Sequence, residues 1–150
     1  MGELRVGMAA PDFELYDQAG RAVRLSGFRG LSPVVLFFYP KDNTRVCTKE
    51  ACAFRDDYAQ FRAIGAQLFG ISNDSSDSHT EFASRHSLPY PLLCDKGGKV
   101  KKLFGVKSTL GIIPGRATFV IDREGVVRHI FSSQFEADAH VSEALGALRA

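Results

Sequence analysis

The chain has 150 residues and a formal net charge of +2, from 19 Lys and Arg against 17 Asp and Glu. Charges this balanced give no reason to expect a nucleic acid or another polyanion as partner. No apolar run approaches the roughly 20 residues of a membrane-spanning helix, and the residues before Pro11 lack the apolar core of a signal peptide. We therefore expect no membrane contact, and a single domain over residues 1–150 that buries its own core.

The three cysteines, Cys47, Cys52 and Cys94, are odd in number, and two of them lie close together in the sequence. This suits reactive thiols in a reducing compartment better than a secreted disulfide framework. The cytoplasm is the expected location, and a processed protein of an organelle also fits. The four histidines are scattered and lack the Cys/His spacing of a zinc site, so we expect no metal ion and no cofactor.

The first elements are predicted to be a β-hairpin. Residues 13–16 alternate as a short strand, 17–20 have turn chemistry, and the strand returns through Val23 and Leu25. Ser26 is expected to cap a short turn through Phe28. The apolar run 34–39, rich in β-branched and aromatic residues, then predicts a buried strand that ends at Pro40, because proline cannot continue a central ladder.

A polar loop over residues 41–46 leads to a predicted helix over about 47–63, which Gly65 ends. Its inward face has helical spacing and comprises Ala51, Phe54, Tyr58, Phe61 and Ile64. Cys47 therefore lies at or just inside a helix N-terminus that follows a central strand. Backbone N–H groups and the helix dipole at that position favour a thiolate, as do the nearby cations Lys41, Arg45 and Lys49.

The rest of the chain alternates strands and helices. We predict strands over 67–72, 92–93, 117–121 and 126–131, a short helix over 100–104, a loop over 109–114 and a last helix over 137–148. Residues 78–81 fit a capping box that would start one more helix, carrying Phe82, Ala83 and His86. This order predicts an α/β fold with a mixed central sheet flanked by helices on both faces.

Pro40, Thr44 and Cys47 have the spacing of the active-site motif of the peroxiredoxins, and the chain resembles that family of thiol peroxidases. The segment CTKEACAFRD (47–56) is similar to the peroxiredoxin Q branch, also called bacterioferritin comigratory protein, although Arg45 and Val46 replace the usual Pro-Gly. Further matching motifs lie at 10–13, 70–72, 114–116 and 119–122. The resemblance implies a thioredoxin-like fold with an N-terminal β-hairpin extension.

The resemblance also implies roles for five residues. Cys47 would be the nucleophile that attacks the peroxide and becomes a sulfenic acid. Thr44 would hydrogen-bond the thiolate and the peroxide, Pro40 would shield the pocket, and Arg116 would stabilise the thiolate. Cys52 would be the resolving cysteine, which forms a disulfide with Cys47. Cys94 is better interpreted as a small packed side chain.

A Cys47–Cys52 disulfide conflicts with a regular helix. Residues five apart in a helix have Cα atoms about 8–9 Å apart, whereas a disulfide needs roughly 4.4–6.8 Å. If Cys52 resolves Cys47, the helix must unwind locally in each cycle. Thr48, Lys49 and Glu50 are expected to contribute little burial, which would ease this opening.

The leading hypothesis is a thiol-dependent peroxidase that reduces hydrogen peroxide and organic hydroperoxides. By resemblance it would be a thioredoxin-dependent peroxiredoxin of the atypical 2-Cys type, recycled by thioredoxin or a similar dithiol donor, and a monomer. A thiol–disulfide oxidoreductase is an alternative, although that chemistry usually depends on Cys-x-x-Cys. A redox sensor or holdase-type binding module, switched by the same disulfide, is an alternative of another class.

Overall fold

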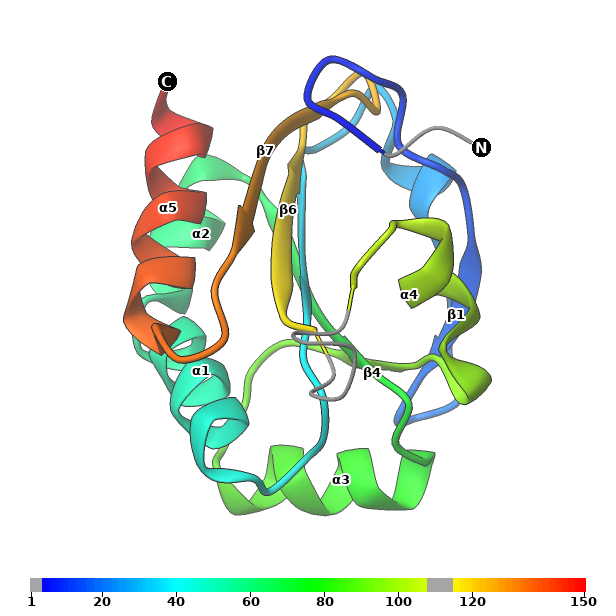
Figure 1. The fold of residues 1–150 in the computed structure, drawn as a ribbon, viewed down its shortest axis with the longest axis vertical. Helices are drawn as coiled ribbons and strands as arrows, with labels where there is room; N and C mark the ends of the chain where they lie inside the picture. The colour runs from blue at the N-terminus through cyan, green and yellow to red at the C-terminus, as the bar shows by residue number, and fades with distance from the viewer. Residues whose placement is uncertain (1–3, 108–114) are drawn as a thin grey trace.

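The computed structural model describes residues 4–107 and 115–150, and within these ranges one mixed sheet of seven strands forms the centre (Figure 1). The strand order is β2-β1-β5-β4-β3-β6-β7. The strands are β1 (Glu14–Asp17), β2 (Ala22–Arg24), β3 (Val34–Phe38), β4 (Gln67–Ser72), β5 (Leu92–Cys94), β6 (Ala117–Ile121) and β7 (Val127–Ser132).

The central strand β3 pairs in parallel with β4 and antiparallel with β6. All five of its residues are buried. Val35 and Phe37 belong to the core on one face of the sheet, whereas Leu36 and Phe38 belong to the core on the other. Because both faces are covered, the strand has a continuous apolar run instead of alternation, which confirms the buried strand predicted here.

Helices cover both faces. Figure 1 shows α1 (Arg45–Asp56), α2 (Tyr58–Ile64) and α5 (Ala137–Arg149) together on one side of the sheet. Phe82 of α3 (Ser76–Arg85) joins the same core, while α4 (Lys99–Leu103) and the 3-10 turn η1 (Leu25–Phe28) pack on the opposite face. A second 3-10 turn, η2, spans Lys96–Gly98. The predicted mixed sheet flanked by helices is therefore confirmed.

The N-terminal β-hairpin is also confirmed. Strand β1 pairs antiparallel with β2 and, on its other side, with β5, so the hairpin extends the central sheet. The predicted cap at Ser26 is wrong, because η1 begins one residue earlier and has Arg24 at its N-cap. The Ser26 backbone N–H instead donates to Asp12 Oδ1 at 2.8 Å, which ties the turn to the segment before β1.

The helix that carries Cys47 is shorter than predicted. It begins at Arg45, two residues early, and ends at Asp56, and α2 begins after a break at Asp57 (φ −102°, ψ 10°). The Asp57 backbone N–H reaches the carbonyls of both Ala53 and Arg55, which tightens the last turn of α1. The inward face continues across this break, and the predicted stop at Gly65 holds, with φ of 85°.

The predicted capping box at residues 78–81 is wrong as a helix start. Helix α3 begins at Ser76, and Ser75 is its N-cap, whose hydroxyl accepts a 3.2 Å hydrogen bond from the Ser78 N–H. The predicted loop over 109–114 lies outside the described residues.

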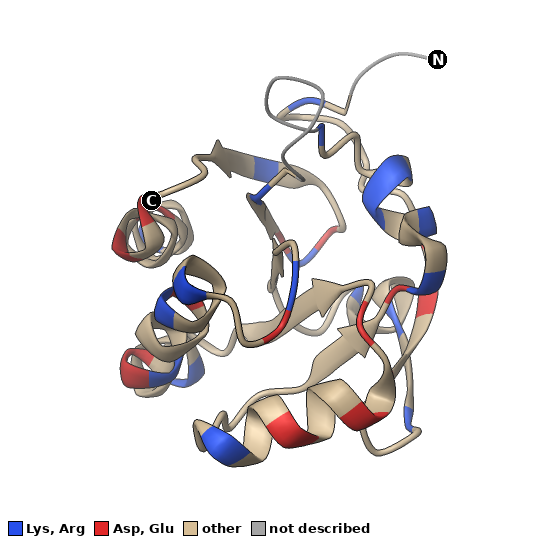
Figure 2. Ribbon diagram, turned by 60° about the horizontal axis from the view of Figure 1, so that its bottom comes forward, with Lys and Arg blue, Asp and Glu red and all other residues tan. Residues whose placement is uncertain are grey.

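The charged residues of the described ranges do not separate by sign (Figure 2). None of the helices in the described ranges is long and apolar enough to cross a membrane. Figure 2 shows Lys and Arg positions interspersed with Asp and Glu positions, so charges of both signs are spread over the molecule.

Candidate active site

Cys47 is the third residue of α1 and is only 1% exposed. The chain leaves β3, passes Pro40, and turns at Asn43, whose positive φ of 63° is one that asparagine tolerates. Thr44 is the N-cap residue, and its carbonyl accepts the Thr48 N–H at 2.8 Å. The N–H groups of the first turn have no partner within the helix, so their dipoles lie where a negative sulfur would be stabilised.

Arg116 lies just before β6, the strand next to β3, and its side chain contacts Cys47. Its side chain is 3% exposed, and Nη2 donates to Cys47 Sγ at 3.2 Å. Its Nη1 donates to Glu50 Oε1 at 2.5 Å, and its Nε donates to the Gln134 carbonyl at 3.1 Å. Burial alone would lower the pKa of Arg116, but the charges and hydrogen bonds of Glu50 and Cys47 outweigh it and raise that pKa. The guanidinium is therefore a fixed cation against the sulfur.

Glycine is required immediately before this arginine. A Cβ at Gly115 would lie 1.9 Å from the Lys107 carbonyl oxygen, a distance at which the backbone would have to move. The close approach of these two segments sets the position from which Arg116 enters the site. Of the predicted motif at 114–116, Pro114 lies outside the described residues.

Glu50 is the site residue that the sequence analysis missed. It was expected to contribute little burial, and this is wrong: its side chain is 0% exposed. It lies three residues after Cys47, one turn along the same helix face, so both contact Arg116. Burial raises the pKa of Glu50 to about 7, although the Arg116 charge opposes the shift. This is a carboxyl group that changes charge near neutral pH.

The second oxygen of Glu50 faces His140 of α5. Oε2 has no hydrogen-bond partner within the described residues and lies 3.4 Å from His140 Nδ1. His140 Nε2 is 2.8 Å from the Ser133 carbonyl, so Nε2 carries a proton, and Nδ1 accepts from the Thr118 hydroxyl at 2.7 Å when the ring is neutral. Burial lowers the pKa of His140, which favours that neutral ring.

Cys52 lies farther along α1 and is half-buried, and both thiols are free. Helix α1 is continuous from Arg45 to Asp56, so it carries both cysteines in one regular segment. Ala51 and Phe54, on either side of Cys52 in sequence, are fully buried, and the Phe54 ring stacks on Phe37 with centroids 4.4 Å apart. This half of the helix is therefore fixed to the sheet.

Thr44 and Pro40 lie in the segment between β3 and α1. The Thr44 residue is exposed, and its hydroxyl donates to the Lys41 carbonyl at 2.9 Å. Pro40 is half-buried directly after Tyr39. The structure therefore places Thr44 at the start of the Cys47 helix with its hydroxyl engaged by the preceding turn.

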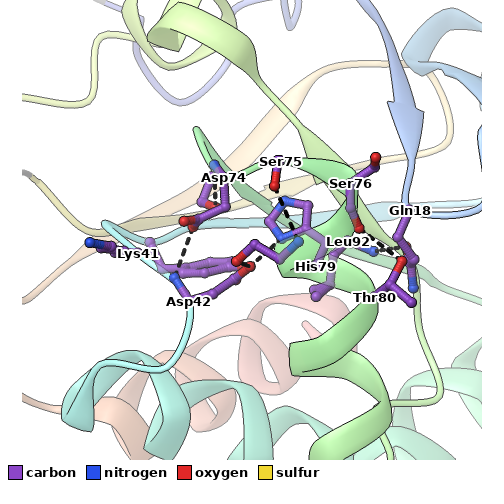
Figure 3. A network of polar contacts seen from close by, with 12 residues as sticks. Gln18, Lys41, Asp42, Asp74, Ser75, Ser76, His79, Thr80 and Leu92 are labelled. Atoms are coloured by element: carbon purple, nitrogen blue, oxygen red, sulfur yellow. Dashed lines mark hydrogen bonds and ion pairs between the residues drawn. The ribbon is translucent and has the colours of Figure 1, made fainter.

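A second buried network fixes the loop before α1 (Figure 3). Asp42 Oδ1 accepts from the Tyr39 hydroxyl at 2.6 Å, and Oδ2 lies 2.7 Å from His79 Nδ1 and 2.9 Å from the Ser78 hydroxyl. The Asp42 N–H donates to Asp74 Oδ2 at 2.8 Å. These contacts join the β3–α1 loop to the start of α3 across more than 30 residues of sequence.

The same cluster is where the described residues come nearest to a metal site. Asp42, Asp74 and His79 each offer one ligand atom, and these atoms lie within 4.8 Å of one another. Yet the facing oxygens of Asp42 and Asp74 already accept hydrogen bonds from protein donors. A cation would have to displace those donors, so the arrangement suits a structural anchor.

Comparison with known proteins gives the class. Residues 6–130 match the AhpC/TSA family. The peroxidoxin BcpB structure from Mycobacterium tuberculosis superposes with a TM-score of 0.89 at 45% identity, covering 98% of this chain and 97% of that one. A Xanthomonas campestris bacterioferritin comigratory protein, whose structure concerns its alkyl peroxide reduction activity, gives 0.84 at 28% identity, covering 97% and 96%.

Two plant relatives give the branch. Peroxiredoxin Q, chloroplastic, from Oryza sativa subsp. japonica is 50% identical over 149 residues, 99% of this chain and 68% of the relative. Its Arabidopsis thaliana namesake is 52% identical over 145 residues, 96% and 67%. The chain belongs to the AhpC/TSA family of peroxiredoxins, in the peroxiredoxin Q branch. It is a thiol-dependent peroxidase that acts on peroxides, and the predicted thioredoxin-like fold is confirmed.

Proposed function

We propose that the protein reduces hydrogen peroxide and organic hydroperoxides through a Cys47 sulfenic acid and a Cys47–Cys52 disulfide. The observation that carries this proposal is the 3.2 Å contact between the Arg116 guanidinium and Cys47 Sγ at a helix N-terminus. A thiolate is the reactive form of cysteine, and a fixed cation beside it stabilises that form.

The first step oxidises Cys47. Its thiolate attacks one peroxide oxygen, the O–O bond breaks, and a new S–O bond forms. The leaving alkoxide, or hydroxide from hydrogen peroxide, takes up a proton and departs as an alcohol or water. In this proposal Arg116 stabilises the negative charge as it moves from sulfur to oxygen, Thr44 hydrogen-bonds the peroxide after its hydroxyl leaves the Lys41 carbonyl, and Pro40 limits access by water.

The second step resolves the sulfenic acid. The Cys52 thiolate attacks Cys47 Sγ, an S–S bond forms, and the sulfenic oxygen leaves as water after protonation. A dithiol donor then returns two electrons, which makes the protein a thioredoxin-dependent peroxiredoxin of the atypical 2-Cys type. Because both cysteines belong to one chain, the cycle needs no second subunit, and we propose a monomer.

The plant relatives are named chloroplastic. A reducing compartment, either the cytoplasm or the interior of such an organelle, is the proposed setting, because the cycle needs a supply of dithiol. We propose no cofactor or metal ion for the reaction, because the thiols carry both electrons.

The experiment is steady-state peroxide consumption with thioredoxin, thioredoxin reductase and NADPH, comparing wild type with Cys47→Ser, Cys52→Ser and Cys94→Ser. Cys47→Ser should abolish turnover, since a serine hydroxyl is scarcely ionised at neutral pH. Cys52→Ser should oxidise once and then stop, while Cys94→Ser, the matched control, should behave as wild type. Near-normal turnover by Cys47→Ser would refute the assignment, as would a disulfide between other cysteines found by mass spectrometry.

A further inference from the structure

Two adjoining hollows of about 470 and 570 Å³ lie between α1 and α5. Their walls share Ala53, Asp56, Asp138 and Ala139, so the two hollows adjoin, and together they are here called the α1–α5 groove. Cys52 lines the first hollow, which makes it the cysteine of the proposed disulfide that a visiting molecule meets at this surface. Cys47, by contrast, is 1% exposed.

Phe135 stands at the end of the groove next to Cys52. It is 74% exposed, the highest value among the large apolar side chains of the described residues. A single exposed aromatic ring is common on protein surfaces, but beside a reactive cysteine and a groove it is the kind of side chain that supplies much of the binding energy when a partner docks. Such residues contribute most where the surrounding backbone is already fixed, because little conformational freedom is lost on binding.

The backbone that carries Phe135 is fixed by the catalytic site itself. The Gln134 carbonyl accepts from Arg116 Nε at 3.1 Å, and the Ser133 carbonyl lies 2.8 Å from His140 Nε2. The Ser132 hydroxyl donates to the Arg116 carbonyl at 3.0 Å. The backbone just before Phe135 is thus attached through three half-buried hydrogen bonds, two of them to the same arginine that contacts Cys47.

The hollow beside Cys52 is acidic, and this indicates the kind of partner that fits it. Asp56, Glu136 and Asp138 line it against the single cation Lys49. An acidic rim around an exposed aromatic ring fits a protein surface with apolar groups and a basic side chain beside its reactive cysteine. A small peroxide has no use for such an extended surface.

We propose that the α1–α5 groove, with Phe135 at its end, is the docking surface for the dithiol protein that reduces the Cys47–Cys52 disulfide. The partner binds through Phe135, Asp56 and Asp138, which lie outside the α1 residues 47–52 that the disulfide is expected to unwind. This inference depends on the disulfide cycle proposed above. The partner's first thiolate attacks Cys52 Sγ, the Cys47–Cys52 bond breaks, and Cys47 leaves as a thiolate that Arg116 stabilises. The partner's second thiolate then attacks the mixed disulfide and releases Cys52, so two electrons pass to this chain and the partner becomes a disulfide.

The test compares a protein reductant with a small one. Phe135→Ala should lower kcat/KM for a recombinant thioredoxin by about tenfold, the scale of one interface anchor, mainly through KM. Turnover with dithiothreitol, and the single-turnover rate of peroxide with reduced enzyme, should stay within about twofold, because neither reaction needs the docking surface. Leu31→Ala, which truncates a 68% exposed side chain outside the groove, is the matched control and should change none of these.

A second variant tests the charge. Asp138→Lys should also raise KM for thioredoxin, and raising the salt concentration should reduce the difference from wild type. Unchanged thioredoxin kinetics in both variants would overturn the proposal, and so would a wild type that dithiothreitol reduces but thioredoxin does not. A dimer that Phe135→Ala dissociates, with unchanged thioredoxin kinetics, would instead make the groove an interface between copies. The disulfide cycle fails separately, if mass spectrometry of peroxide-treated wild type finds no Cys47–Cys52 bond.

Discussion

Asp42 and Glu50 are buried carboxylates on either side of Cys47 in the sequence, and their surroundings differ sharply. Asp42 accepts hydrogen bonds from hydroxyl groups on both oxygens and pairs with His79, whose two ring nitrogens each face an oxygen. Glu50 has one oxygen on Arg116 and the other without a donor within the described residues. A satisfied buried carboxylate is suited to anchoring, whereas an unsatisfied one that shares its cation with a thiol is suited to reactions that move charge.

The first prediction tests the anchor. Asp42→Ala should destabilise the protein by about 3–5 kcal/mol, because the Tyr39 hydroxyl, the Ser78 hydroxyl and the His79 ring lose their acceptor, at about 1–3 kcal/mol for each buried group left unsatisfied. Asp42→Asn keeps the shape and most hydrogen bonds, so about 1–3 kcal/mol is expected. Urea unfolding at pH 7 measures both. If Asp42→Ala costs less than 1 kcal/mol, the network of Figure 3 does not anchor the loop.

The second prediction tests Arg116, the cation that contacts both Glu50 and Cys47. Arg116→Gln should slow the reaction of Cys47 with peroxide by about 10²–10³, the usual cost of removing one charge-stabilising donor. Single-turnover kinetics of the reduced enzyme with hydrogen peroxide measure this rate. Arg123→Gln is the matched control, since that arginine is exposed and lies outside the site. An unchanged rate in Arg116→Gln would remove the guanidinium from the chemistry.

The third prediction concerns pH and Glu50. Because burial raises the pKa of Glu50 from 4.5 to about 7, the folded protein binds this proton more tightly than the unfolded chain does. This contribution to stability is complete below pH 4.5 and is lost as the pH rises through 7, by about 3 kcal/mol. Glu50→Gln should remove that loss, so the variant should gain stability relative to wild type between pH 4.5 and 7.

Several other charged or titratable groups face Glu50, and their effect on the pH dependence has to be separated from that of Glu50. They are Arg116 from the segment before β6, Cys47 on its own helix, His140 from α5, and Tyr90, whose hydroxyl donates to the Ala51 carbonyl. Burial lowers the pKa of His140, which reduces stability as the pH falls below 6.5, the opposite sign. Both proteins keep this histidine, so the difference between their pH–stability curves reports Glu50. Parallel curves from pH 4 to 8 would contradict the prediction.

The sequence predicted the parts of the molecule that local pattern determines. The run 34–38 has the composition of a buried strand, and residues 117–121 form the predicted strand with the same ends. Wherever several local signals competed, prediction was less accurate: Ser75 caps α3 instead of the box at 78–81, because the Ser78 hydroxyl donates to Asp42 from another part of the chain.

The partnership of Glu50 could not be predicted by the same means. Charged residues on helices are mostly exposed, and the arginine that justifies burying this one is 66 residues away in the sequence. The spacing of Cys47 and Glu50 on one helix face was the single local signal, and it does not identify the cation. Long-range pairs of this kind depend on the sheet that brings β6 beside β3.

The last and smallest effect concerns α1 itself. Forming the proposed Cys47–Cys52 disulfide must bring the two Cα atoms from about 8–9 Å to roughly 4.4–6.8 Å, so part of the helix has to unwind. The burial of Glu50 changes what this opening involves, because unwinding the first turns would also separate it from Arg116. Phe54, 0% exposed and stacked on Phe37, opposes opening of the later turns.

We therefore expect opening to be confined to the N-terminal half of α1. In the disulfide form, amide hydrogen exchange should lose about tenfold protection or more over residues 47–52, equivalent to about 1.4 kcal/mol, while residues 53–56 keep theirs. Cys52→Ser treated with one equivalent of peroxide is the control, because it is oxidised without a Cys47–Cys52 bond. Equal protection in reduced and disulfide-bonded wild type would exclude unwinding, whereas loss extending through residue 56 would show that the Phe54 contact does not hold the second half of the helix.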